Sequence, residues 1–134
     1  MKNFYQAGVA SGDITPPVGG PLAGLYRGGH HSSTGIYHPL RVTATSITDE
    51  ENTAVLIISS EWLGSYELTN RIREKISEST GIPASQIMLS ATHTHCGPLV
   101  RKIGESVHGK IDQDYLEQAI ETIVKTACRA MEQR

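Results

Sequence analysis

The 134-residue sequence is short of aromatic residues and of cysteine, and both shortages restrict its class. Aromatic residues make up 5%, so a core must be built from Ile, Val, Leu and Ala. Two cysteines, Cys96 and Cys128, are too few for the disulfide framework of a small secreted scaffold, and two free thiols are the plainer interpretation. The hydrophobic fraction of 38% still suffices for a core, which excludes wholesale disorder.

The sequence also lacks an excess of one charge and a long hydrophobic run. The net charge of −2 excludes the strongly basic surface by which proteins bind nucleic acid or an anionic membrane. No apolar run approaches the roughly 20 residues that span a bilayer, so we expect no transmembrane segment. The N-terminal residues lack the apolar stretch of a signal peptide, which favours a cytoplasmic location, or a secreted one if the chain is a processed fragment.

Glycine and histidine are plentiful and unevenly placed. Eight of the 13 glycines lie in the first 35 residues, many of them in a loop predicted over residues 16–39. Loops of this length without regular structure are usually functional or disordered. The six histidines gather at positions 30–31, 38, 93 and 95, with one more at 108.

Periodicity predicts three strands in the first half of the chain. Residues 5–14 form a strand that the double proline at 16–17 ends. Residues 40–47 alternate apolar with polar positions, as a half-buried strand does, and pair through a short turn with residues 53–59. The continuous apolar run within 53–59 predicts a strand buried on both faces, hence a sheet covered on both sides.

The second half predicts a helix, a strand and a further helix. The helix over 65–80 ends at Gly81, followed by a strand over 87–91. The last helix, over 113–131, begins after Asp112, a favourable N-cap. Because two strands flank the first helix, we expect a parallel pair with a right-handed crossover. The fold class is α/β, a mixed β-sheet with a βαβ unit and at least two packing helices.

The strongest chemical signal is Ser-Ala-Thr-His-Thr-His-Cys-Gly-Pro at residues 90–98, directly after a buried strand. Ligands bind at the carboxyl ends of strands in open α/β sheets. In an extended chain His93 and His95 point to one side while Thr94 points away. Two adjacent imidazoles are a natural pair of ligands for Zn²⁺ or a similar metal. The plainer interpretation is a pair of hydrogen-bonded histidines.

This segment resembles the Thr-His-Thr-His-Ser-Gly-Pro signature in the N-terminal domain of the neutral/alkaline (non-lysosomal) ceramidase family. Weaker similarities follow in the family's order over most of the chain. Residues 8–16 resemble its opening strand, residues 37–44 the strand after its glycine-rich loop, and residues 55–64 its second strand, which carries an acidic residue near its end. The Gly-Ile-Pro at 81–83, before the next strand, is similar as well.

The resemblance implies a Zn²⁺-dependent amide hydrolase, in which the metal polarises the carbonyl and lowers the pKa of a bound water. It implies that His93, matching the first histidine of the signature, is a zinc ligand. His95 is implied to hydrogen-bond the substrate or a neighbouring group, with direct ligation of the metal as the alternative. The implied substrate is a small-molecule or lipid-like amide.

The chain also departs from the family. The family's catalytic domain is several times longer, and its other zinc ligands, a His, a Glu and a Tyr, lie in downstream segments that match nothing here. Cys96 replaces the usual Ser, and Leu99-Val100 replace the usual Gly-Gly. Because a catalytic zinc site needs about three protein ligands, residues 1–134 are either a single α/β domain with a different site or the N-terminal fragment of a larger ceramidase-like domain.

Glu61 is the strongest candidate for completing a site within this chain. It follows the buried strand 53–59, where a carboxylate can ligate a metal or act as a general base. The alternative for Glu61 is an exposed residue at a strand end. Cys96 is a weaker candidate, for a nucleophile, because the neighbouring His95 is expected to point to the other side.

For the other histidines the plainer interpretations are favoured. His30 and His31 are expected to be a solvated pair in the glycine-rich loop. His38 precedes Pro39 and is expected to make a structural hydrogen bond. His108 lies in a second loop and is expected to face solvent.

Two hypotheses of different classes follow. The first is a zinc-dependent amide hydrolase resembling neutral ceramidase, or a piece of one. The second is a non-catalytic α/β module, or a homo-oligomer whose interface completes a shared or degenerate site. An unrelated His-x-His amidohydrolase is a third, but such barrels need about 250 residues.

Overall fold

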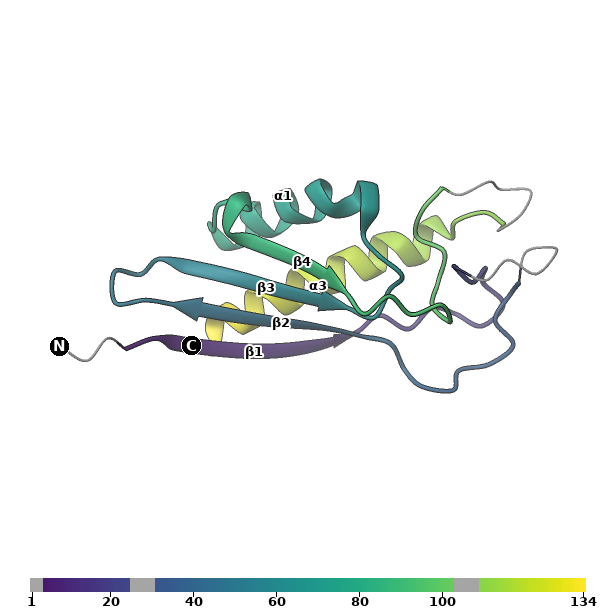
Figure 1. Cartoon of the computed structure of the whole chain (residues 1–134), viewed down its shortest axis with the longest axis horizontal. Helices are drawn as coiled ribbons and strands as arrows, with labels where there is room; N and C mark the ends of the chain where they lie inside the picture. Colours follow the sequence, from purple (N-terminus) through teal and green to yellow (C-terminus); the bar gives the residue numbers. More distant parts are fainter. Residues whose placement is uncertain (1–3, 25–30, 103–108) are drawn as a thin grey trace.

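A computed structural model describes residues 4–24, 31–102 and 109–134, and these build one mixed sheet with helices packed against it (Figure 1). The strands are β1 (Gln6–Asp13), β2 (Arg41–Thr48), β3 (Ala54–Ser60) and β4 (Ile87–Ala91). The helical segments are η1 (Tyr66–Leu68), α1 (Thr69–Thr80), η2 (Ala84–Gln86) and α3 (Gln113–Glu132). The predicted α/β class, with a mixed sheet and two packing helices, is confirmed.

The strands lie in the order β1-β2-β3-β4. β1 and β3 both pair antiparallel with β2, while β4 pairs parallel with β3 after the α1 crossover, as the predicted βαβ unit requires. The turn between β2 and β3 is organised by Asp49, whose Oδ1 accepts the backbone N–H groups of Glu51 and Thr53 at 3.0 and 2.7 Å. A short aspartate turn of this kind sets the register of the hairpin.

α1 ends, and α3 begins, at the residues that the sequence indicates. Gly81 adopts the left-handed conformation, with φ of 75°, and its N–H donates to the Ser77 carbonyl at 2.9 Å. The Asp112 side chain accepts the N–H of Tyr115 at 3.0 Å and so caps α3. The first helix differs slightly from the prediction, because its first turn is the 3₁₀ segment η1 and the α-helix begins only at Thr69.

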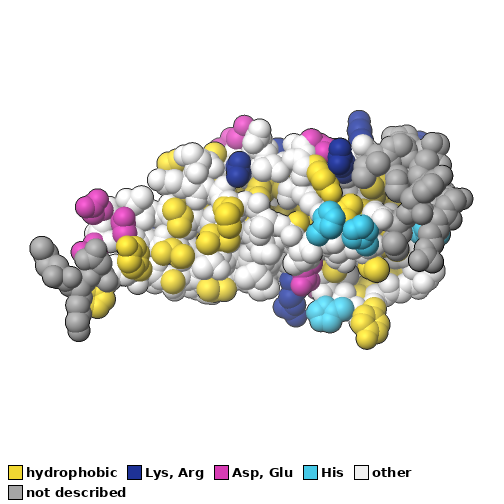
Figure 2. All heavy atoms as spheres, viewed as in Figure 1, with side chains coloured by type: hydrophobic (Ala, Val, Ile, Leu, Met, Phe, Trp, Pro, Cys, Tyr) yellow, Lys and Arg dark blue, Asp and Glu magenta, His cyan; other side chains and the backbone are white. Residues whose placement is uncertain are grey.

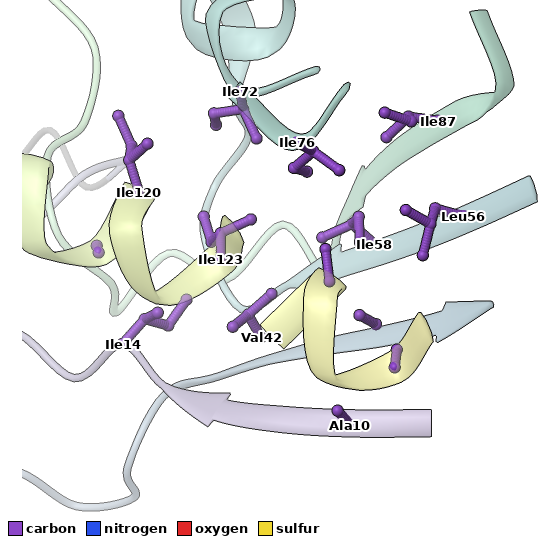
Figure 3. Packing of buried hydrophobic residues seen from close by; sticks show 14 of the residues in the cluster. Ala10, Ile14, Val42, Leu56, Ile58, Ile72, Ile76, Ile87, Ile120 and Ile123 are labelled. Atoms are coloured by element: carbon purple, nitrogen blue, oxygen red, sulfur yellow. The ribbon is translucent and has the colours of Figure 1, made fainter. Parts of the chain in front are cut away.

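The core lies between the sheet and the two α-helices and is almost entirely aliphatic, as the scarcity of aromatic residues predicts (Figure 3). Branched side chains from the strands face branched side chains from the helices. The fully buried members are Val42, Leu56, Ile58 and Ile87 of the sheet, Ile72 and Ile76 of α1, and Ile120 and Ile123 of α3. The buried Trp62, just beyond β3, belongs to the same core.

The expectation that the sheet is covered on both sides is wrong. Leu56 and Ile58 of β3 are buried beneath the helices, but Val55, the residue before Leu56, is 39% exposed, and Met88 of β4 is 51% exposed. Both α-helices pack on the face of the sheet that bears Leu56 and Ile58. They also pack against each other, which places them on the same side. Figure 2 shows hydrophobic side chains gathered over the strands on the uncovered face.

Within the described residues, no helix is both long and apolar enough to cross a lipid bilayer.

Candidate functional site at the end of β4

The chain leaves the sheet at the histidine motif. β4 ends at Ala91, but the next two N–H groups still donate to the neighbouring segment, Thr92 to the Ser60 carbonyl and His93 to the Trp62 carbonyl, both at 3.0 Å. His93 itself has φ of 62°, a left-handed conformation that is uncommon outside glycine. The motif is therefore bent at His93 and not extended as the sequence pattern suggests.

The structure nevertheless brings His93 and His95 together. Their ring centroids lie 5.1 Å apart with an angle of 76° between the ring planes. Nδ1 of His93 lies 2.7 Å from the Leu63 carbonyl oxygen, and Nδ1 of His95 lies 2.9 Å from the Gly24 carbonyl oxygen. A carbonyl oxygen only accepts, so in each ring Nδ1 carries the hydrogen and the neutral ring keeps its lone pair on Nε2.

The anchor for His95 comes from the start of the glycine-rich loop. Residues 21–24 run antiparallel to residues 97–99, with the Ala23 N–H donating to the Gly97 carbonyl at 3.0 Å and the Leu99 N–H to the Pro21 carbonyl at 2.9 Å. A small apolar cluster, made of Ala23, Leu63 and Leu99, joins these segments. Residues 25–30, which contain the rest of the loop and His30, lie outside the described residues.

The side chains between and after the histidines face a different space. Thr94 and Cys96 line a cavity of about 390 Å³ that Leu40 and His38 also line. Neither His93 nor His95 lines this cavity. Cys96 therefore faces a space that His95 does not line, and both Cys96 and Cys128 are free thiols.

Glu61 is engaged at the end of β3. Its Oε2 accepts the N–H of Arg41 at 2.7 Å, and its own N–H donates to the Arg41 carbonyl at 2.9 Å. This contact ties the end of β3 to the start of β2. Within residues 4–24, 31–102 and 109–134, no third His, Cys, Asp or Glu joins the two histidines in a metal-binding group.

The remaining histidines differ in how well they were predicted. His38 makes a local hydrogen bond, with Nδ1 2.8 Å from the Pro39 carbonyl oxygen. The expectation of a solvated His31 is wrong: its Nε2 is buried, without a hydrogen-bond partner among the described residues. The backbone of His31 is paired within the loop, where the Leu22 N–H donates to the His31 carbonyl at 2.8 Å. His108 lies outside the described residues.

A buried hydrogen-bonded group lies behind the site and was missed by the sequence analysis. The indole Nε1–H of Trp62 donates to the Tyr115 hydroxyl at 3.0 Å, and that hydroxyl donates to the Ile14 carbonyl at 2.6 Å. Burial raises the pKa of Tyr115 far above its ordinary value, so the phenol stays protonated and remains a donor. The lone tryptophan directly after a buried strand was the one sequence signal for this group.

Comparison with known proteins gives matches at the level of structure. No protein-family profile matches the chain, and no curated protein sequence matches it either. The fold is similar to the crystal structure of neutral ceramidase from Pseudomonas aeruginosa, with a TM-score of 0.80 and 17% identity over 99% of this chain and 22% of that one. It is also similar to a ceramidase complexed with C2, with a TM-score of 0.76 and 18% identity over 96% of this chain and 21% of that one.

These likenesses establish a ceramidase-like fold. The chain spans about a fifth of the length of either ceramidase structure, since it covers 22% of one and 21% of the other.

Proposed function

We propose that this chain forms part of a zinc-dependent amide hydrolase resembling neutral ceramidase, with His93 as a metal ligand. His95 is the second ligand, or else the group that hydrogen-bonds the substrate. The observation that carries the proposal is the anchoring of both imidazoles through Nδ1 to backbone carbonyls, which leaves both Nε2 atoms for a ligand. The ceramidase-like fold supports a small-molecule or lipid-like amide as the substrate class.

The donor set fits zinc as part of a site. Imidazole nitrogen is a preferred zinc ligand, and ligating histidines usually donate their other ring N–H to a carbonyl or carboxylate, which orients the ring. Zinc, when bound, polarises an amide carbonyl and lowers the pKa of its bound water. Since such sites use about three protein ligands, the pair supplies two at most, and the rest must come from outside the described residues or from another chain.

Glu61 is proposed as the general base, at the same end of the sheet. Its Oε2 already accepts the Arg41 N–H, so Oε1 is the oxygen that would accept a proton. Glu61→Gln keeps an acceptor for Arg41 while removing the basic carboxylate. In a chain that hydrolyses an N-acyl amide, this substitution should lower turnover by about 100-fold or more and leave the thermal unfolding midpoint nearly unchanged.

Metal binding tests the first part of the proposal. The chain should bind Zn²⁺ in a calorimetric titration, and Co²⁺ in its place should give the absorption bands of an imidazole-bound ion. His93→Ala should weaken zinc binding by at least about tenfold, because it removes one of the ligands. His38→Ala is the matched control, since Nδ1 of His38 also contacts a backbone carbonyl but His38 lines a cavity that neither member of the pair lines. Absence of zinc binding, or equal binding by His93→Ala, would contradict the proposal.

A second candidate is a non-catalytic α/β module, or a homo-oligomer with a degenerate or shared site. The uncovered face of the sheet favours it. One row across this face, Val9–Thr45–Ile57–Met88, contains no charged residue, and exposed apolar patches of this kind often mark interfaces. Light scattering after size exclusion, with and without zinc, separates the candidates. A strict monomer that holds zinc excludes the second candidate.

A further inference from the structure

We infer that Tyr115 is a positioning residue for His93, acting through Trp62. The inference rests on the proposed role of His93 as a ligand. The observation behind it is the buried hydrogen-bonded group of Trp62, Tyr115 and Ile14. This group joins the first turn of α3 to the residues that hold the backbone and ring of His93.

The first step is the contact between Tyr115 and Trp62. The Tyr115 hydroxyl accepts the Trp62 indole N–H at 3.0 Å and donates to the Ile14 carbonyl at 2.6 Å, so both of its roles are used. Trp62 is fully buried, and the other two residues are buried as well. The backbone of Tyr115 is itself held by the Asp112 cap at the start of α3. The indole is therefore fixed at its polar end as well as by packing.

The second step is the contact between residues 62–63 and His93. The carbonyl of Trp62 accepts the His93 N–H at 3.0 Å, and the carbonyl of Leu63 lies 2.7 Å from Nδ1 of the ring. These two carbonyls are adjacent along the chain, so a shift of the backbone at Trp62 alters both contacts at once. His93 also has φ of 62°, a conformation that persists in a non-glycine residue only where its surroundings hold it.

A hydroxyl is needed at position 115 because the groups around it are polar and buried. A phenyl ring fills nearly the same volume, but it leaves the Trp62 indole N–H and the Ile14 carbonyl without this partner. A buried polar group without a partner is strongly unfavourable, so the indole is expected to shift toward another acceptor or toward water. That shift carries the Trp62 backbone with it and loosens the anchor of the His93 ring.

The experiment uses Tyr115→Phe in the full chain, with ¹⁵N-labelled histidine observed by NMR at one alkaline pH. In the unsubstituted chain we expect His93 to be the tautomer with hydrogen on Nδ1. In Tyr115→Phe the ring ¹⁵N shifts of His93 should move toward a mixture of tautomers, while those of His38 stay in place. Zinc affinity should fall about tenfold, as it does when a group that orients a ligand is lost. Tyr37→Phe, which removes a fully exposed hydroxyl, is the matched control.

A double-mutant cycle tests the route through Trp62. Trp62→Phe removes the indole N–H and should move the His93 ring shifts in the same way. Adding Tyr115→Phe to it should then change those shifts little, because the two residues act in series. If Tyr115→Phe does not fold, Trp62→Phe alone tests the contact with His93.

Two results overturn the inference. One is a lower unfolding midpoint in Tyr115→Phe with unchanged ring shifts of His93, which reduces Tyr115 to a role in stability. The other is a pair of independent, additive shifts in the double-mutant cycle. The ring shifts of His93 and the unfolding midpoint are both measured without a bound metal. Failure of the unsubstituted chain to bind zinc therefore counts against the proposed function and leaves the ring measurement valid.

Discussion

At the scale of single residues, the position of His95 depends on Gly24. The Gly24 carbonyl anchors the ring, and the Gly24 backbone has φ of 85°, which favours glycine. A Cβ built at this position would lie 2.7 Å from Nδ1 of His95. Atoms cannot stay at that distance without a shift, so the absence of a side chain at position 24 is a condition for the histidine pair.

Gly24→Ala should therefore displace the His95 ring. We expect altered ring ¹⁵N shifts for His95 and at least about tenfold weaker zinc binding, because the ring loses its orienting contact. An alanine in the left-handed conformation also destabilises the fold by about 1–2 kcal/mol. Chemical denaturation and NMR of the same sample measure the two effects separately.

Gly19→Ala is the control for backbone strain. Gly19 has φ of 99°, and a Cβ there would meet nothing within 4 Å. Gly19→Ala should lower the free energy of unfolding by a similar amount and leave the ring ¹⁵N shifts of His95 unchanged. If both alanine variants change the His95 ring shifts equally, backbone strain, and not the contact at Gly24, affects His95.

At the scale of elements, α1 and α3 are joined by an ion pair on their exposed side. Arg71 of α1 donates two hydrogen bonds to the Glu117 carboxylate of α3, at 2.8 and 2.6 Å. The guanidinium holds the pKa of Glu117 below its ordinary value of 4.5. The side chains are 42% and 48% exposed, so solvent screens the interaction.

The pair makes a small, pH-dependent contribution to stability. Because the pKa of Glu117 is lowered in the folded state, the contribution is present above the ordinary glutamate pKa and is lost as the pH falls below it. Glu117→Gln should lower the free energy of unfolding by about 0.2–1 kcal/mol near neutral pH and by less in acid. Glu121 is the control, because its exposed carboxylate lies 3.7 Å from Lys125 of the same helix. Glu121→Gln should change the free energy of unfolding less than Glu117→Gln does. A loss in Glu117→Gln that stays constant down to acid pH would contradict the assignment.

At the scale of the whole molecule, the part of the chain that the structure describes gives the sheet one face in the core and one face on which no helix packs. Ile57 and Ile58 are neighbours in β3 and point to opposite faces. Ile58 is fully buried and Ile57 is half-buried, so the same substitution at the two positions measures how each face is covered.

Ile58→Ala should lower the free energy of unfolding by about 2–5 kcal/mol, since it opens a cavity in the core. Ile57→Ala should cost about 1 kcal/mol or less, because its side chain already contacts solvent. Urea unfolding of both variants makes the comparison. Equal losses would mean that another layer covers the outer face in solution.

Much of the fold could be predicted from the sequence because its signals are local. The period of two in residues 40–47, the left-handed cap at Gly81 and the aspartate cap at Asp112 each act within a few residues of their own position. The histidine pair could be found in the same way, since both members lie in one short segment after a strand. These features depend only on residues that are close along the chain, so the sequence alone is enough to predict them.

The tertiary structure alone decided how the sheet is covered and how the histidines are held. A run of apolar residues in β3 is compatible with one covered face or with two, and the packing of α1 against α3 leaves one of them open. The anchors of His93 and His95 are carbonyls 30 and 71 residues away, and a backbone carbonyl has no side chain by which a sequence could reveal it. Glu61 likewise faces an N–H group 20 residues away, a contact made only when β2 and β3 pair. Residue types along the chain thus identified the imidazoles, while contacts between distant segments determined which of their nitrogens are left for a ligand.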